Sequence, residues 1–293
     1  RALRRAAEAD PGDPEPWRLL LQLYRVEERA WEARRLGDEA LAAVIPSSRR
    51  EVLRDATLAL LADLPDDQAR AALDRWVAAD PADVDARVAR LRRSAAHPSA
   101  DEPDRAARIA ALADLLERTP AHTGARELLV ESLADAGDPQ RGRQVLDAWP
   151  PGSRDGRYDR LLGRWQLDYE RDPAGAAASF ERALGDFPYD WRTHYRLARA
   201  CRALGRDDQA RREAEIVGRL RETLDPAVLG PRLSADVARL DESSSCRDLA
   251  DLCARAGLAT LADAWRREAE SSSTPLGSSE QKPPAALRHR PPE

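Results

Sequence analysis

The chain has 293 residues, a formal net charge of −5 and a hydrophobic content of 42%. This modest negative charge lacks the basic footprint of a dedicated nucleic-acid-binding protein, so we expect no nucleic acid among its partners. Aromatic residues make up only 5% of the chain, while Leu, Ala, Arg, Asp and Glu dominate, which favours helices over a sheet. We predict an all-α fold. No apolar run reaches the ~18 residues of a membrane span, so none is expected.

Two further features of the composition concern the source of the chain. Lys282 is the single lysine among 47 basic residues, and methionine is absent, even at position 1. We expect from this a high-GC bacterial genome and a fragment of a longer product. A targeting segment would lie before the first residue, so the sequence does not fix the compartment. The cytoplasm is slightly favoured.

Helical spacing begins at the start of the chain. Residues 1–11 predict one helix that belongs to an incomplete repeat. In the next hairpin, Trp17 and Tyr24 share the apolar stripe of the first helix and Ala33 lies on the second. Pro46 ends that hairpin, since proline lacks the backbone N–H that a continuing helix needs.

Two longer segments follow. Residues 49–81 predict another pair of helices, the second of which opens with Asp-Asp-Gln-Ala-Arg at Asp66. The same five residues recur at Asp207, where acidic side chains suit the positive end of a helix dipole. From 83 to 120 the pair is longer, because a long interhelical loop is expected near 95–103.

The clearest internal repeat lies further along the chain. Leu162-Gly163 opens the first copy, and three inward positions of its second helix recur 34 positions later. These are Ala176, Phe180 and Ala183, which return as Ala210, Ala214 and Val217. The pattern resembles the tetratricopeptide repeat, which has Trp-x2-Leu-Gly-x2-Tyr, then Ala-x3-Phe, then Pro on a 34-residue period. Trp17, Leu20 and Tyr24 follow it as well.

The resemblance implies a right-handed solenoid of antiparallel helix hairpins over residues 1–270. The period fails at an irregular insertion near 224–244, where a short helix is expected near 234–240. A capping hairpin is predicted at 245–270, with a wetted outer face that includes Glu268. The Ser/Pro-rich stretch 271–293 has almost no apolar content and predicts a disordered tail.

No motif for chemistry is present. The sequence lacks H-E-x-x-H, the P-loop, G-x-G-x-x-G and G-x-S-x-G. Four histidines lie far apart, without a second ligand at metal-binding spacing: His97, His122, His194 and His289. Three cysteines are too few for a disulfide framework and are interpreted as core residues: Cys201, Cys246 and Cys253. We predict no catalytic residue, no metal and no cofactor.

One surface feature points to a binding face. Seven residues share an arc on successive first helices, at a spacing of 3.6 residues per turn. They are Arg157, Arg160, Arg164, Arg192, Tyr195, Arg199 and Arg202. The resemblance places this arc in a concave groove, where guanidinium rows bind carboxylates in bidentate fashion. The alternative is a solvated arginine face, and the intervening helix offers Glu127 and Glu131 instead.

The leading hypothesis is therefore a non-enzymatic scaffold that binds a protein or peptide segment, an acidic one if the arc is the groove. The alternative is the regulatory or substrate-selecting arm of a larger enzyme whose catalytic domain precedes residue 1. RNA binding by a helical-repeat array is disfavoured by the acidic net charge.

Overall fold

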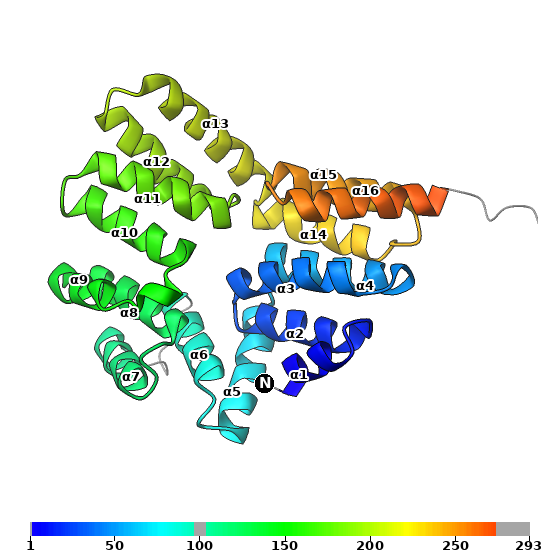
Figure 1. Ribbon diagram of the computed structural model, residues 1–293, viewed down its shortest axis with the longest axis horizontal. Helices are drawn as coiled ribbons and strands as arrows, with labels where there is room; N and C mark the ends of the chain where they lie inside the picture. The colour runs from blue at the N-terminus through cyan, green and yellow to red at the C-terminus, as the bar shows by residue number, and fades with distance from the viewer. Residues whose placement is uncertain (1, 97–103, 274–293) are drawn as a thin grey trace, which may run out of the picture.

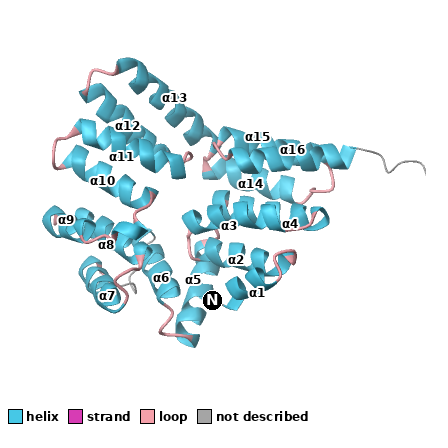
Figure 2. Cartoon of the chain, viewed as in Figure 1, coloured by secondary structure: helices cyan, strands magenta, loops and turns pink. Residues whose placement is uncertain are grey.

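The computed structural model describes residues 2–96 and 104–273. Over these ranges the chain forms sixteen α-helices and one short 3-10 helix, without a strand, which confirms the all-α prediction (Figures 1 and 2). Helix α6 (Val84–Ala96) extends into the start of the long loop predicted near 95–103, and residues 97–103 lie outside the described part of the chain.

The helices follow one another with short connections. Those up to the middle of the chain are α1 (Ala2–Ala9), α2 (Pro14–Val26), α3 (Ala30–Ala43), α4 (Pro46–Leu61), α5 (Asp66–Ala79), α6, α7 (Arg105–Arg118) and α8 (Thr123–Asp135). The remainder are α9 (Pro139–Asp147), η1 (Pro151–Ser153), α10 (Gly156–Asp168), α11 (Pro173–Asp186), α12 (Trp191–Ala203), α13 (Asp207–Thr223), α14 (Pro226–Val237), α15 (Ser243–Arg255) and α16 (Ala259–Ser273).

Aspartate side chains start many of these helices. Asp13 accepts a hydrogen bond from the backbone N–H of Glu15 at 3.0 Å, and Pro14 occupies the first helical position. An aspartate N-cap satisfies a backbone N–H that has no partner within the helix. An aspartate N-cap that accepts a backbone N–H begins six further helices, at Asp104, Asp138, Asp155, Asp172, Asp190 and Asp225.

The predicted internal repeat is present as the hairpins α10–α11 and α12–α13, but its inward positions are only partly confirmed: Ala214 is exposed and Val217 is half-buried on α13. Ala176, Phe180 and Ala210 are all buried in one hydrophobic cluster. The Phe180 ring lies so close to Gly163 that an added Cβ atom there would meet it at 2.7 Å. Glycine at this position therefore lets the two helices of the hairpin approach each other.

The stacking changes direction after α4. The two helices predicted for 49–81 are present, but α5 packs mainly on α6 rather than on α4. Extended backbone at Ala62 and Pro65 separates α4 from α5 and turns the chain. The repeats therefore curve around a centre instead of continuing in one line (Figure 1).

The C-terminal hairpin of α15 and α16 packs against the N-terminal helices, as Figure 1 shows beside α3 and α4. Leu53 and Trp265 belong to one hydrophobic cluster that joins the two ends of the array. The Trp265 indole N–H, on a side chain with 0% exposure, donates to Thr57 Oγ1 at 2.9 Å. Arg50 pairs with Glu268 at 3.4 Å. The helical array is thus closed into a ring.

This closure corrects one expectation for the last hairpin. Asp263 and Arg266 are exposed, as predicted for a wetted face. The side chain of Glu268, however, is only 12% exposed, because it turns toward Arg50 on α4. The helix also continues past the predicted end of the hairpin to Ser273, and residues 274–293 of the predicted tail lie outside the described ranges.

The insertion between α13 and α15 also differs from prediction. In place of a short helix near 234–240, α14 covers Pro226–Val237 and contains Pro231 in its interior. Leu229 and Leu233 are buried in the cluster that joins the chain ends. The proline removes one helical hydrogen bond, and burial of these leucines stabilises the helix.

Candidate functional site

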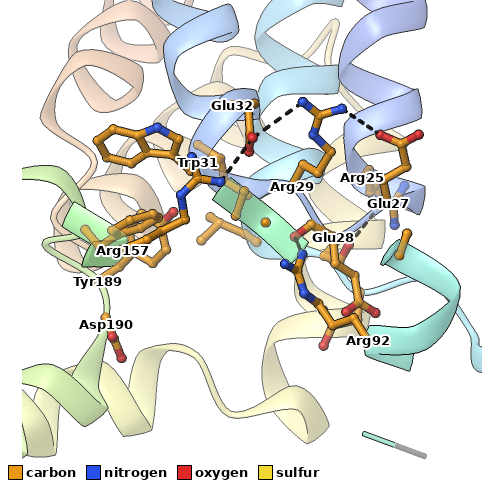
Figure 3. Close-up of a pocket in the computed structure, with 18 of the residues that line it drawn as sticks. Arg25, Glu27, Glu28, Arg29, Trp31, Glu32, Arg92, Arg157, Tyr189 and Asp190 are labelled. Atoms are coloured by element: carbon orange, nitrogen blue, oxygen red, sulfur yellow. Dashed lines mark hydrogen bonds and ion pairs between the residues drawn. The ribbon is translucent and has the colours of Figure 1, made fainter. Parts of the chain in front are cut away.

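A cavity of about 1070 Å³ lies inside the ring. Its walls come from the α2–α3 turn, the end of α4, the inward sides of α6, α8 and α10, the segment between α11 and α12, and α14 (Figure 3). Segments far apart in the sequence therefore meet at one place. The cavity has a charged side and an aromatic side.

The charged side is built on the α2–α3 turn. Glu28 adopts a left-handed backbone conformation with φ 54°, which is uncommon for a residue other than glycine. Its carbonyl accepts a hydrogen bond from Arg92 Nη1 at 3.1 Å, and its carboxylate pairs with Arg93 at 2.5 Å. The Arg29 N–H closes the turn on the carbonyl of Tyr24 at 2.8 Å. Helix α6 thus fixes this turn at the edge of the cavity.

Glu27 is a buried carboxyl group in the same turn. It is 2% exposed and accepts a hydrogen bond from Arg29 Nη1 at 3.1 Å. Burial raises the pKa of Glu27 to about 7, and the charge of Arg29 offsets only part of that effect. Arg29 also pairs with Asp85 at 3.1 Å and with Glu32 at 3.4 Å, so one guanidinium connects three carboxyl groups.

Asp85 and His122 extend this network to α8. His122 Nδ1 accepts the backbone N–H of Ala125 at 3.0 Å, which leaves Nε2 to donate to Asp85 at 3.0 Å. Burial raises the pKa of Asp85, but the hydrogen bond from His122 and the charge of Arg29 outweigh it and hold the pKa below its usual value. Asp85 is therefore a stable anion within the network.

Arg157 was predicted from sequence to lie in a groove, and the structure places it at the cavity in a nearly buried position. Its Nη1 donates to Glu32 at 3.1 Å across the ring, and its Nη2 donates to Asp155 at 2.6 Å. Burial lowers the pKa of Arg157, yet the hydrogen bond to Asp155 and the charge of Glu32 raise it overall. Both terminal nitrogens of this guanidinium therefore bind carboxylates of the protein itself, and Figure 3 shows the contact with Glu32.

Arg160 is neutralised in a similar way. Its Nη2 donates to Glu127 at 2.7 Å and to Glu131 at 2.8 Å, both on α8. Burial lowers the pKa of Arg160, but the charges of Glu131 and Glu127 raise it far above its usual range. Glu127 also pairs with Arg92 at 3.2 Å, so α6, α8 and α10 are joined by alternating charges.

The rest of the predicted arc remains more accessible. Arg192 lines the cavity and stacks on Trp191, with 4.8 Å between the guanidinium carbon and the ring centre. Arg199 is half-exposed and pairs with Asp168 at 3.3 Å. Tyr195 is 50% exposed and Arg202 is exposed. Arg164 pairs with Asp135, the last residue of α8, at 3.5 Å. Arg157, Arg160 and Arg192 thus reach the cavity, whereas the other four lie along the face beside it.

The aromatic side of the cavity was missed by sequence reasoning. Trp31 packs on Phe187 with 4.9 Å between ring centres, and Phe187 contacts Tyr189 at 5.9 Å. Burial raises the pKa of Tyr189, whose hydroxyl has no hydrogen-bond partner within the described residues. Trp31 and Phe187 lie far apart in the sequence, so no local pattern indicates their contact.

Arg196 was also missed, because it lies one position outside the predicted arc. Its pKa is lowered by burial and by the charges of Arg164 and Arg160. The predicted arc followed a single stripe of residues on α12. Considering every arginine of α12 on the side of α10 would have included Arg196.

Other predicted positions are structural. His194 is buried and contacts Glu213 at 2.6 Å and the Pro188 carbonyl at 3.1 Å, as predicted for a packed, hydrogen-bonded histidine. The three cysteines are free and buried. Among the described residues, no cluster of three His, Cys, Asp or Glu side chains suits a metal ion, and none of the helices there is long and apolar enough to cross a membrane.

The fold and these inward faces define a helical-hairpin repeat protein. Residues 169–223 match the family model described as Tetratricopeptide repeat, in agreement with the resemblance found in the sequence. Repeats of this kind generally serve as scaffolds for protein–protein interaction. No curated protein matches the chain.

Several solved structures are similar at low identity. The crystal structure of MamA has a TM-score of 0.34 and 15% identity, covering 58% of this chain and 88% of that one. A chain of the APC/C hetero-tetramer Cut9-Hcn1 has a TM-score of 0.46 and 14% identity, covering 92% and 48%. The human IFIT1 dimer with PPP-AAAA has a TM-score of 0.43 and 15% identity, covering 75% and 49%. The chain spans about half the length of the latter two.

Proposed function

We propose that the inner face of α10 and α12, together with the central cavity, binds a segment of a partner protein that carries acidic side chains. The protein is then a scaffold without catalytic chemistry of its own. The observation that carries this proposal is the contrast between the two helices. Each arginine of α10 pairs with a carboxylate of the protein itself: Arg157 with Glu32 and Asp155, and Arg160 and Arg164 with carboxylates of α8. Of the arginines of α12, Arg199 alone forms an ion pair with a described residue.

The accessible groups on α12 suit a polypeptide. Tyr195 offers a flat apolar ring with a polar end, and Arg192 presents a guanidinium that forms no ion pair with any described residue. Next to them, Phe187 and Trp191 give the cavity an aromatic wall. A volume of about 1070 Å³ accommodates several side chains of one segment. Apolar anchoring and charge pairing are therefore available side by side.

The charge of this face favours an acidic segment. Arg192 and Arg202 have no carboxylate partner among the described residues, and Arg199 is only singly paired. A guanidinium donates two parallel hydrogen bonds to a carboxylate, a partner that a basic segment does not supply. Exposed pairs of this kind are screened by salt, so binding weakens as the ionic strength rises.

The test uses fluorescence anisotropy with labelled short peptides of acidic, neutral and basic composition, and a single-stranded RNA as a further probe. We expect the acidic peptides to bind, and charge reversal by Arg192→Glu with Arg199→Glu to weaken them by about 1–2 kcal/mol. The matched control reverses two exposed arginines of α13, Arg211→Glu with Arg212→Glu. Equal losses in both double variants, or preferential binding of RNA, would contradict the proposal.

A further inference from the structure

Trp191 lies at the edge of the cavity with two arginines over its indole ring. The guanidinium carbon of Arg192 lies 4.8 Å from the ring centre, and that of Arg221 lies 5.3 Å from it. Trp191 and Arg192 line the cavity at the start of α12. Arg221 belongs to the last turn of α13, three residues before Leu224, which also lines the cavity. The ends of two consecutive helices therefore bring two guanidinium groups to one ring.

The donors of these two guanidinium groups are accessible and unused. Arg192 and Arg221 are both exposed, and neither side chain forms an ion pair or hydrogen bond with any described residue. A guanidinium over an aromatic ring uses its flat face for that contact, and the N–H groups in its plane stay free for an acceptor. The ring also restricts the rotamers of both side chains, so less conformational entropy is lost when an acceptor binds.

Asp190 is the carboxylate beside this ring, and the protein itself uses it. It caps α12 by accepting the backbone N–H of Arg192 at 3.0 Å and the hydroxyl of Thr193 at 2.7 Å. Its negative charge also acts on Arg160 and on Arg196. Asp190 thus contacts the backbone of Arg192 and leaves the guanidinium of that residue without a partner.

The carboxylates that follow Arg221 along the chain are engaged as well. Glu222 pairs with Arg255 on α15 at 3.7 Å. Asp225 is the N-cap of α14 and accepts the backbone N–H of Ala227 at 3.0 Å. The Arg221 guanidinium therefore points to an acceptor from outside the described residues.

We infer that Arg192 and Arg221 bind two acidic side chains of the partner segment, one carboxylate on each guanidinium, and that Trp191 positions both. This inference rests on the proposed function and specifies how the segment is held at the edge of the cavity. The two guanidinium carbons are no further apart than the sum of their distances to the shared ring centre. Side chains at positions i and i+2 of an extended segment lie on one side, about 7 Å apart. The site therefore suits two acidic residues separated by one residue.

The contacts of Trp191 favour a polypeptide over a single-stranded nucleic acid. Proteins bind bases by stacking them on an aromatic side chain that is free to receive them. A base on Trp191 would compete with two guanidinium groups for the ring. Carboxylates bind to the edge of a guanidinium and leave its contact with the ring in place.

The test measures the binding of a labelled peptide to the full chain by fluorescence anisotropy. The peptide has an amidated C-terminus and two glutamates separated by one residue. Arg221→Gln should weaken its binding about three- to tenfold, the range for a partly exposed pair of charged groups. This loss should be smaller for peptides in which either glutamate is changed to glutamine. The matched control is Arg219→Gln, which removes an exposed arginine from the opposite side of α13 and should leave affinity unchanged.

The role of Trp191 is tested by a pair of variants. Trp191→Leu removes the ring and should weaken the two-glutamate peptide by a similar factor. Trp191→Phe keeps a ring for the guanidinium groups and should restore most of the affinity. Equal affinities of these two variants would overturn the positioning role of the ring.

The remaining outcomes separate this inference from the proposed function. If Arg221→Gln binds as tightly as the wild type while Arg192→Glu with Arg199→Glu still weakens binding, the inference fails and the proposed function stands. If no acidic peptide binds the wild type, both fail. A single-stranded RNA that binds more tightly than the peptide and depends on Arg221 would overturn the assignment to acidic side chains.

Discussion

Closure of the ring depends on Trp265, and its removal gives a quantitative prediction. The side chain is 0% exposed, belongs to the cluster that joins both chain ends, and donates its indole N–H to Thr57 at 2.9 Å. Replacing a buried tryptophan by alanine costs about 3–5 kcal/mol. A domain is stable by about 5–15 kcal/mol in total, so Trp265→Ala should remove a large share of it.

The loss should have a geometric consequence as well. Because α16 connects the C-terminal hairpin to α4, Trp265→Ala should let the two ends separate and increase the radius of gyration in small-angle X-ray scattering. The matched control is Trp149→Ala. Trp149 is 1% exposed and donates to the Ser153 carbonyl at 3.0 Å, but it lies among α8, α9 and α10 and not between the chain ends.

Urea unfolding followed by circular dichroism measures the first effect, and scattering under native conditions measures the second. Both variants should lose several kcal/mol of unfolding free energy, and only Trp265→Ala should expand the molecule. An unchanged radius of gyration for Trp265→Ala, or an equal expansion for Trp149→Ala, would refute the reasoning that this contact closes the ring.

Two further predictions concern stability. The pKa of Glu27 is about 7 in the folded protein and 4.5 ordinarily. Its contribution to the free energy of unfolding is therefore complete below about pH 4.5 and is lost as pH rises toward 7, a fall of about 3 kcal/mol. Glu27→Gln should remove this pH dependence. Plots of unfolding free energy against pH that stay parallel for wild type and variant across this range would contradict the prediction. Gly163→Ala should destabilise by about 1–3 kcal/mol, because its Cβ meets Phe180 at 2.7 Å. Gly218→Ala, with open space around it on α13, should stabilise by up to about 1 kcal/mol in the same denaturation assay.

Local patterns were sufficient for most of the helices. The spacing of Ala176, Phe180 and Ala210 predicts a repeated hairpin, because each position depends on contacts within one repeat or with the next. Asp and Pro at the helix starts act within a single turn. Such features can be interpreted from the sequence without knowledge of the remaining chain.

Long-range features were not predictable in this way. Pro231 in its interior made α14 look irregular, and its stability depends on leucines that pack against helices near the other chain end. Ring closure through Trp265 is equally non-local. The arc of arginines was predicted from helical spacing alone, but Arg157 is occupied by Glu32, a residue 125 positions away.

The most direct measurement locates a bound acidic peptide on the molecule. A benzophenone amino acid replaces Tyr195 on the inner face in one variant and Arg212 on the outer face in another, and each is irradiated with the peptide. The account predicts a cross-link from position 195 that excess unlabelled peptide suppresses, and none from position 212. Cross-linking from position 212 alone, or equally from both, would contradict binding at the inner face.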